Sequence, residues 1–176
     1  MRILLIGDIV GSPGRDAVKK IVPKLRRDKS IDFVIANAEN VAGGSGLTPE
    51  TVEELLQSKV DVITSGDHIW KKKEIYDALN KDKRIIRPAN YPETSPGSGM
   101  TIISLENKKK IAVINLLGRV FMNPVDCPFT AAEREIGKIN RATKIILVDM
   151  HAEATSEKIA MGRFLDGNRR RFSYTY

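Results

Sequence analysis

The sequence predicts an α/β fold. Short apolar runs typical of buried strands alternate with helical patterns in the order βαβαβα, followed by a hairpin and then αβα. Several of the runs end in a residue that could bind a metal or move a proton. A hydrophobic content of 41% and a charged content of 29% in 176 residues are ordinary for one globular domain. We therefore expect a mixed sheet or two sheets, covered by helices.

The first half of the chain contains three strand–helix repeats. Apolar runs predict strands at 2–7, 32–37 and 60–64. Ser12-Pro13 and Thr48-Pro49 each resemble a helix start, with the hydroxyl residue as N-cap and proline in the first turn. In the first of these helices, the apolar residues that follow helical spacing and should face the core are Val18, Ile21, Val22 and Leu25. A third helix is expected at 72–79.

The second half changes character after a short fourth strand expected at Ile85-Ile86. Residues 88–99 are rich in Pro, Gly and Ser and predict a long loop. Two apolar runs separated by a polar, lysine-rich turn predict an antiparallel hairpin at 100–105 and 111–116. A helix at 129–140, a strand at 144–150 and a helix at 155–165 complete the pattern.

Four predicted strands are followed closely by side chains that suit catalysis. These side chains are Asp8, Glu39 with Asn40, Asp67 with His68, and His151. Carboxylate and amide oxygens bind hard cations, and imidazole is a common metal ligand and proton donor. Because an α/β protein builds its site at the carboxyl ends of its strands, we expect these groups to converge. A metal-assisted enzyme is the leading interpretation.

Each motif alone has a structural explanation. Asp8 could cap the following helix, Glu39 could belong to a polar turn, and each histidine could be held at a strand end. The spacing of the early glycines matches neither the dinucleotide-binding fingerprint nor the P-loop. Gly43-Gly44-Ser45-Gly46 allows a further alternative, a doubly wound domain that binds nucleotide without metal. The coincidence of polar groups at four strand ends favours a shared metal site.

Composition restricts the partners. The net charge of +7 points to anionic ligands, but the Lys71–Lys73, Lys108–Lys110 and Arg169–Arg171 runs are short and scattered, as on solvated faces. The single cysteine, Cys127, excludes an internal disulfide and suits a reducing cytoplasm. We see no signal peptide and no apolar run long enough to cross a bilayer, so we expect no membrane partner.

Five motifs together resemble the YmdB-like branch of the calcineurin-like metallophosphoesterases, over Met1 to about Gly167. The motifs are Gly-Asp8-Ile-Val-Gly, Asn-Ala-Glu39-Asn40, Gly-Asp67-His68-Ile-Trp70, Arg87-Pro-Ala-Asn-Tyr-Pro92 and Asp149-Met-His151-Ala-Glu-Ala-Thr-Ser-Glu157-Lys. The resemblance implies a four-layer αββα sandwich with mixed sheets. It also implies two metal ions, usually iron or manganese, and hydrolysis of phosphodiesters, typically 2′,3′-cyclic nucleotides.

The resemblance assigns roles position by position. Asp8 would bind the first metal, Glu39 would bridge both, and Asn40, Asp67 and His151 would serve the second. His68 would protonate the leaving oxygen while a hydroxide activated by the two metals attacks phosphorus.

Two departures from the family stand out. The family has Asn where this chain has Asp67, and the added negative charge should reduce the chemistry without abolishing it. The family's later Thr-His-Thr-His strand, which gives one imidazole to each metal, is not found before Tyr176. About the last third of the family's length is therefore expected to be missing, and the remaining chemistry to be weak.

The expected domain organisation follows from these departures. Residues 1–167 are assigned to the metallophosphoesterase domain and 168–176 to an atypical tail. We interpret the tail as a one-base frameshift, because one choice of codons for it, read one base later, encodes the strand-like Thr-Val-Ala-Val-Leu-Val-Thr-His-Thr. A sheet left incomplete in this way favours homo-oligomers. The alternative to an enzyme is a non-catalytic regulatory or RNA-associated protein that keeps the fold and uses its positive charge.

Overall fold

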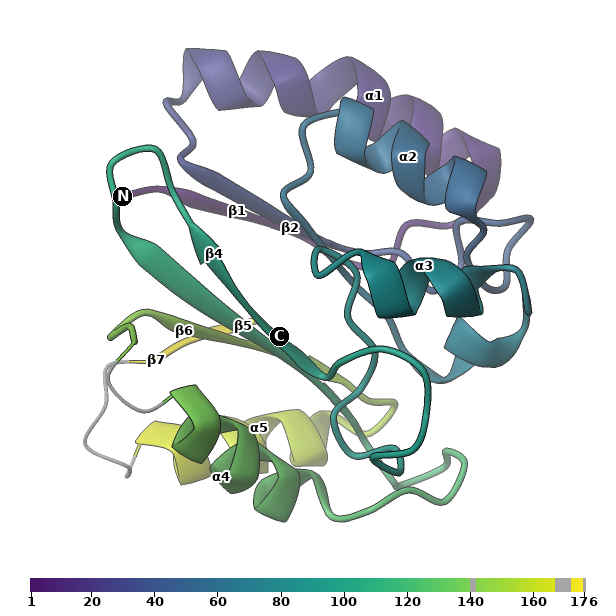
Figure 1. The fold of residues 1–176 in the computed structure, drawn as a ribbon, viewed down its shortest axis with the longest axis vertical. Helices are drawn as coiled ribbons and strands as arrows, with labels where there is room; N and C mark the ends of the chain where they lie inside the picture. Colours follow the sequence, from purple (N-terminus) through teal and green to yellow (C-terminus); the bar gives the residue numbers. More distant parts are fainter. Residues whose placement is uncertain (140–141, 167–171, 176) are drawn as a thin grey trace. The chain divides into compact units, whose positions relative to one another are not determined.

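The protein is described by a computed structural model of residues 1–139, 142–166 and 172–175, with side chains described as far as residue 166. The chain divides into two compact units, Met1–Ile85 and Ile86–Tyr176. Each unit has one β-sheet with helices packed on it (Figure 1). The α/β fold class with two sheets is thereby confirmed.

The first unit has a parallel sheet in the order β1-β2-β3. The strands are β1 (Ile3–Ile6), β2 (Phe33–Asn37) and β3 (Val62–Thr64). The helices are α1 (Gly11–Asp28), α2 (Pro49–Gln57) and α3 (Ile75–Lys81), with a short 3₁₀ helix, η1 (Asp67–Trp70), after β3. All three predicted strands are confirmed, whereas η1 was not predicted.

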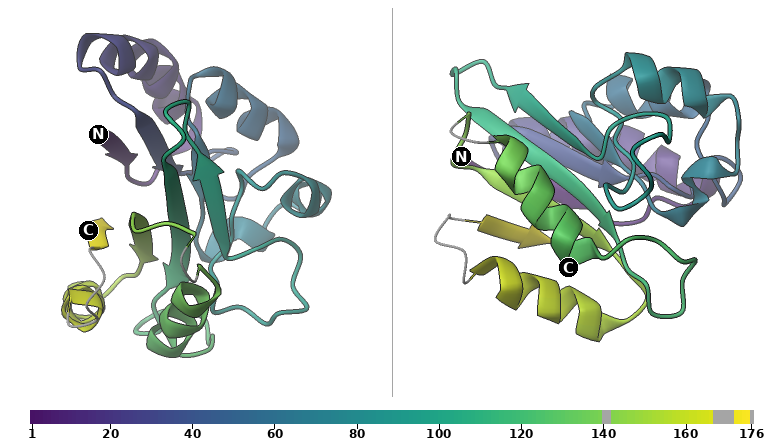
Figure 2. Two further views of the ribbon diagram at one scale, coloured as in Figure 1. Left: turned by 60° about the vertical axis from the view of Figure 1, so that its left-hand side comes forward. Right: turned by 60° about the horizontal axis from the view of Figure 1, so that its bottom comes forward.

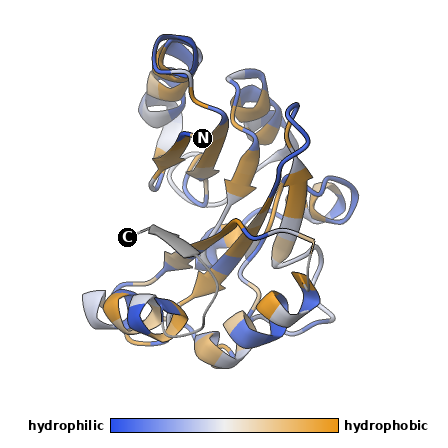
Figure 3. Ribbon diagram, turned by 90° about the vertical axis from the view of Figure 1, so that its left-hand side faces the viewer, coloured by the Kyte–Doolittle hydropathy of each residue, from blue (hydrophilic) through white to orange (hydrophobic). Residues whose placement is uncertain are grey.

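The burial of the strands agrees with their places in this sheet. All five residues of the central strand β2 are buried, and strands enclosed in this way read as continuous apolar runs. On α1, Val18 and Val22 are buried, but Ile21 is 51% exposed, so its predicted place in the core was wrong. Figure 3 shows the same contrast, with apolar strands and helices whose outer faces are polar.

The two predicted helix starts had different outcomes. Thr48 caps α2 as predicted, and its hydroxyl accepts the N–H of Thr51 at 3.3 Å in a capping box. The prediction that Ser12 caps α1 was wrong, because the helix begins at Gly11 after Val10 and has no side-chain cap. Gly11 adopts φ +56° and donates its N–H to the carbonyl of Asn40 at 2.9 Å, which closes the turn one residue earlier.

The second unit has a mixed sheet in the order β4-β5-β6-β7. Its strands are β4 (Met100–Ser104), β5 (Lys110–Leu117), β6 (Ile146–His151) and β7 (Phe172–Thr175). β4 and β5 form the predicted antiparallel hairpin, and the other neighbours run parallel. The predicted helices are α4 (Pro128–Ile139) and α5 (Thr155–Asp166). Instead of a fourth strand, Ile85 and Ile86 form isolated bridges with Ile63 and Ser98.

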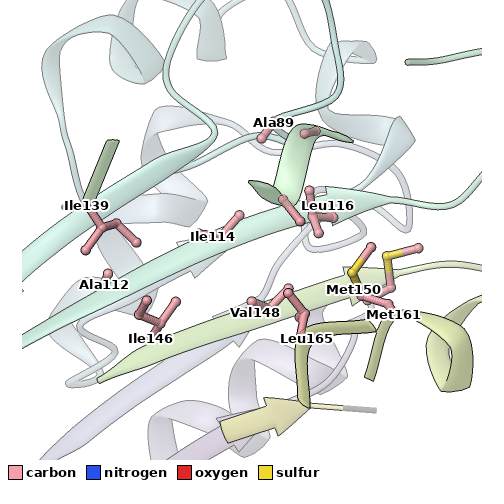
Figure 4. Packing of buried hydrophobic residues seen from close by; sticks show 12 residues of the cluster. Ala89, Ala112, Ile114, Leu116, Ile139, Ile146, Val148, Met150, Met161 and Leu165 are labelled. Carbon is pink, nitrogen blue, oxygen red and sulfur yellow. The ribbon is translucent and has the colours of Figure 1, made fainter. Parts of the chain in front are cut away.

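The core of the second unit lies between the sheet and helices α4 and α5 (Figures 2 and 4). Because side chains alternate between the faces of a strand, every second residue of β5 and β6 contributes to it. The strand residues are Ala112, Ile114, Leu116, Ile146, Val148 and Met150. Ile139 of α4 and Met161 and Leu165 of α5 pack against them. This packing fixes the direction in which β6 delivers His151.

The tail is only partly described. Residues 172–175 form β7 parallel to β6, which the sequence did not predict. Residues 168–171 and 176, which carry the rest of the frameshift interpretation and the Arg169–Arg171 run, lie outside the described residues. The domain assignment 1–167 stays a prediction, as does the stacking of the two units into four layers. Among the described residues, no helix combines the length and apolarity that crossing a membrane requires.

Gly99 should be essential for the second unit. A Cβ atom on Gly99 would lie 2.3 Å from the Cα atom of Ala89. The backbones of Ala89 and Gly99 are held together because both hydrogen-bond to Asn115, at 2.8 and 3.0 Å. We expect Gly99→Ala to lower the free energy of unfolding by about 3 kcal/mol or more, measured by urea denaturation.

Gly137→Ala is the matched control. Gly137 lies inside α4, and a Cβ there meets nothing within 4 Å. This substitution should stabilise the protein by up to about 1 kcal/mol through helix propensity. Equal stability of the two variants would contradict the steric argument.

Candidate active site

The residues predicted to form the site in the first unit do converge. Asp8 follows β1, Glu39 and Asn40 follow β2, and Asp67 and His68 begin η1 after β3. Because the three strands are parallel neighbours, their carboxyl ends share one edge of the sheet. The distances between their side-chain atoms show how closely these residues approach one another.

The side-chain amide of Asn40 connects three of the predicted residues. Its Nδ2 donates to Asp8 Oδ2 at 2.7 Å and to Glu39 Oε1 at 3.1 Å. Its Oδ1 lies 2.6 Å from His68 Nδ1. One amide thus holds two carboxylates and an imidazole together.

This network determines the tautomer of His68. Because the NH₂ group of Asn40 faces two carboxylates, which only accept hydrogen bonds, the carbonyl oxygen must face His68. His68 Nδ1 therefore carries the hydrogen that this oxygen accepts. Nε2 is left as the ring nitrogen that can take up or release a proton.

Glu39 is the most enclosed carboxylate of the group, with 3% of its surface exposed. A carboxylate oxygen of Glu39 and one of Asp67 lie within 4.8 Å of each other. The backbone N–H of His68 points at Glu39 Oε2 at 3.4 Å, and His68 Nδ1 lies 3.5 Å from Oε1. A buried charge is costly unless positive charge lies nearby, so this pair of carboxylates suits a bound cation.

Asn37, the last residue of β2, positions Glu39. Its Oδ1 accepts the backbone N–H of Glu39 at 3.1 Å, and its Nδ2 donates to the carbonyl of Ser65 at 3.3 Å. The side chain therefore joins the ends of β2 and β3. This role of Asn37 was not predicted, although a polar residue at the end of an otherwise apolar strand was the available signal.

A glycine turn holds the other side of Glu39. The carbonyl of Glu39 accepts the N–H of Gly46 at 2.5 Å, and Ala42 donates to the carbonyl of Gly46 at 3.0 Å. Gly46 has φ +88°, and a Cβ there would lie 2.8 Å from Lys72 Cγ. Glycine at this position lets the lysine stem pack against the turn beside the site.

His151 lies at the carboxyl end of β6 in the second unit. It is half-buried and pairs with Leu117 of β5, and its carbonyl accepts the N–H of Gly118 at 2.8 Å. Its position at a strand end was predicted correctly. Its approach to the carboxylates of the first unit stays a prediction.

Two further polar residues organise the loops of the second unit. Asn90, fully buried, donates to the carbonyls of Leu117 at 2.8 Å and Asp126 at 3.0 Å and accepts the N–H of Leu117 at 2.9 Å. Glu157 Oε1 accepts the N–H of Arg119 at 3.0 Å, and Oε2 accepts that of Val120 at 3.2 Å. Both residues lie in the family motifs, but their roles were not predicted.

Arg87, which opens another family motif, serves as a buried anchor for the loop that follows it. Its guanidinium donates to carbonyls of Pro88, Pro92, Ser95 and Pro96. Burial lowers the pKa of the Arg87 guanidinium from its ordinary value. These contacts fold the Pro-rich loop around one charged side chain.

The chain is similar to known proteins in both sequence and structure. The YmdB-like protein family matches residues 4–173. A 2′,3′-cyclic-nucleotide 2′-phosphodiesterase from Bacillus subtilis is 51% identical over 167 residues, which cover 95% of this chain and 63% of that protein. The chain therefore spans less than two thirds of the length of this relative.

Two solved structures are also similar. A hypothetical protein from Thermus thermophilus has a TM-score of 0.89 at 38% identity, covering 99% of this chain and 67% of that one. A structure described as a novel phosphatase from Mycoplasma pneumoniae has a TM-score of 0.85 at 34% identity, covering 94% and 60%. The chain belongs to the YmdB-like family, which confirms the resemblance found in its motifs.

Asn37→Ala should test how firmly the Glu39 backbone is held. The substitution removes one acceptor and one donor that join β2 to β3, which should cost about 1–3 kcal/mol of stability. Urea denaturation measures this loss, and Asn123→Ala, at an exposed loop position, is the control. Wild-type stability of Asn37→Ala would contradict a positioning role.

Proposed function

We propose that this chain carries the catalytic centre of a metal-dependent phosphodiesterase that hydrolyses 2′,3′-cyclic nucleotides. The observation that carries the proposal is the contact of Asn40 with Asp8, Glu39 and His68 at one sheet edge. Family membership and the name of the relative that is 51% identical support the substrate class.

Asp8, Glu39, Asn40, Asp67 and His151 are the proposed metal ligands. Three carboxylates and an amide are hard oxygen donors, and the addition of an imidazole nitrogen favours iron or manganese. When bound, two such ions would lower the pKa of water and neutralise charge on the phosphoryl group. The buried Glu39 fits the bridging role, because a carboxylate with two oxygens can serve two cations.

His68 is the proposed proton donor to the departing ribose oxygen. Asn40 fixes the ring by binding Nδ1, so Nε2 holds the proton to be transferred. A carboxylate oxygen of Glu39 lies 3.5 Å from the same nitrogen, so Nδ1 is enclosed by two acceptors. Proton donation matters here because an alkoxide is a poor leaving group.

Asp67 replaces the family's Asn and adds a negative charge to the site. A carboxylate still binds metal, but it repels the phosphate of the substrate. We therefore propose a slower enzyme with the same chemistry. The single cysteine supports action in a reducing compartment such as the cytoplasm.

Glu39→Gln should abolish the activity. The amide keeps the shape of the side chain but loses the charge that would bridge the metals. We expect the hydrolysis of bis-p-nitrophenyl phosphate and 2′,3′-cyclic AMP with added manganese to fall by more than about 100-fold, since even groups that only support ligands contribute about 10–100-fold. Elemental analysis should show less bound metal.

Glu74→Gln is the control for Glu39→Gln, because Glu74 is exposed and its side chain does not cap α3. It should retain wild-type metal content and rate. A Glu39→Gln variant with normal metal content and activity would exclude the proposed centre. Metal-free wild-type protein that binds RNA in a salt-sensitive way would favour the RNA-associated alternative instead.

Asp67→Asn should improve catalysis. Removing one negative charge beside the substrate phosphate should raise kcat/KM for 2′,3′-cyclic AMP by about tenfold, equivalent to about 1.4 kcal/mol in the transition state. Steady-state kinetics at fixed manganese measures the effect. A lower kcat/KM would mean that this chain depends on the carboxylate.

A further inference from the structure

The loop after β5 forms a pocket within the second unit. It connects Leu117 to α4 and follows the strand end that pairs with His151 (Figure 1). The pocket has a volume of about 480 Å³, and ligand sites usually measure roughly 300–1,000 Å³. It is therefore large enough for a nucleoside.

The lining of the pocket is mostly apolar, with one cation and one carboxylate. Val120, Met122 and Phe129 contribute apolar surface, and the polar groups come from Arg119, Cys127 and Glu157, whose carboxylate already accepts the N–H groups of Arg119 and Val120. In the described part of the chain, the guanidinium of Arg119 makes neither a hydrogen bond nor an ion pair. A guanidinium plane beside apolar side chains is a common way to bind a nucleobase.

The loop is fixed relative to His151. Gly118 donates its N–H to the carbonyl of His151 at 2.8 Å, and a Cβ on Gly118 would lie 2.6 Å from both Ala152 and Glu157. The Glu157 carboxylate then binds the next two backbone N–H groups, those of Arg119 and Val120. The wall that carries Arg119 is thus built directly on the turn that follows the proposed metal ligand.

We propose that this pocket holds the nucleobase of the substrate, with Arg119 lying against the base. The inference rests on the proposed function, because it takes the substrate to be a nucleotide. It makes Arg119, Val120 and Met122 determinants of substrate specificity. A substrate without a base would make no use of them.

Cys127 provides a readout that does not require catalysis. It is the only cysteine of the chain and it lines the pocket. Hydrogen bonds from the backbone N–H groups of Thr130 and Phe129 lower the pKa of its thiol, so it should react with iodoacetamide near neutral pH. A base in the pocket should shield it from the reagent.

The test compares adenosine 3′-monophosphate with ribose 5-phosphate, which has no base. We expect the first to slow alkylation of Cys127 at least about fivefold and the second to leave it unchanged, as base contacts of this kind are worth about 5–150-fold in affinity. Arg119→Ala should raise the concentration of adenosine 3′-monophosphate needed for half-maximal protection by about tenfold. Equal protection by both compounds, or by neither, would overturn the proposal.

Phe121→Ala is the matched control. Phe121 lies in the same loop, is 92% exposed and does not line the pocket. It should leave the protection unchanged. If Phe121→Ala abolishes protection and Arg119→Ala does not, the base stacks on the outer face of the loop and the pocket assignment is wrong.

Kinetics separate this inference from the proposed function. Arg119→Ala should raise KM for 2′,3′-cyclic AMP about tenfold but leave KM for ribose 2′,3′-cyclic phosphate, which has neither a base nor another aromatic ring, within about twofold of the wild type. An equal loss with both substrates would overturn the base pocket while leaving the phosphodiesterase intact. If the wild type hydrolyses neither substrate, the proposed function fails, and the alkylation experiment still decides whether the pocket binds a base.

Discussion

Burial of the Glu39 carboxylate is the constraint around which the first unit is organised. Only 3% of this side chain is exposed, although an isolated buried charge costs several kcal/mol or more. Asn37 holds its backbone, Asn40 donates to one oxygen, and the backbone of His68 points at the other. These donors supply hydrogen bonds to a carboxylate that is closed off from water. On the proposed function, a cation held by Glu39 and Asp67 would further offset the cost of burying this charge.

Asn40 connects the proposed metal ligands to the proposed proton donor. Its NH₂ group faces the carboxylates of Asp8 and Glu39, whereas its oxygen holds His68. Ligation through that oxygen would use its second lone pair, or would require the amide to turn and the bond to His68 to change. In either case the orientation of the His68 ring depends on the residue that would bind metal. If Asn40 and His68 have the proposed roles, metal affinity and proton transfer would therefore be linked through one side chain.

Most of the fold could be predicted because burial leaves a local signal. The buried strands read as apolar runs, and the cap at Thr48 follows from residues three apart. The start of α1 could not be predicted in this way, because it depends on a hydrogen bond from Gly11 to Asn40, which is distant in sequence. The sequence lists the polar groups at the strand ends, but their partners are set by how the strands lie side by side.

The same limit applies to the residues that position the site. Asn37, Asn90 and Glu157 act on backbone groups contributed by other segments, so their roles become visible only with the fold. A motif search finds them, since they lie within the family motifs, but it cannot separate them from ligands. The chemistry of a side chain predicts what it can bind, and only the topology decides what it reaches.

In the second unit, the same turn holds both the proposed metal ligand and the wall of the proposed base pocket. Gly118 is packed against Ala152 and Glu157, directly after His151, and leaves no room for a side chain. Glu157 then fixes the backbone of Arg119 by accepting its N–H. A change that moves this turn would displace the histidine and the pocket wall together. If both proposals hold, metal binding and substrate preference would thus not be independent in this unit, and substitutions that change specificity without loss of metal would be restricted to side chains that face the pocket.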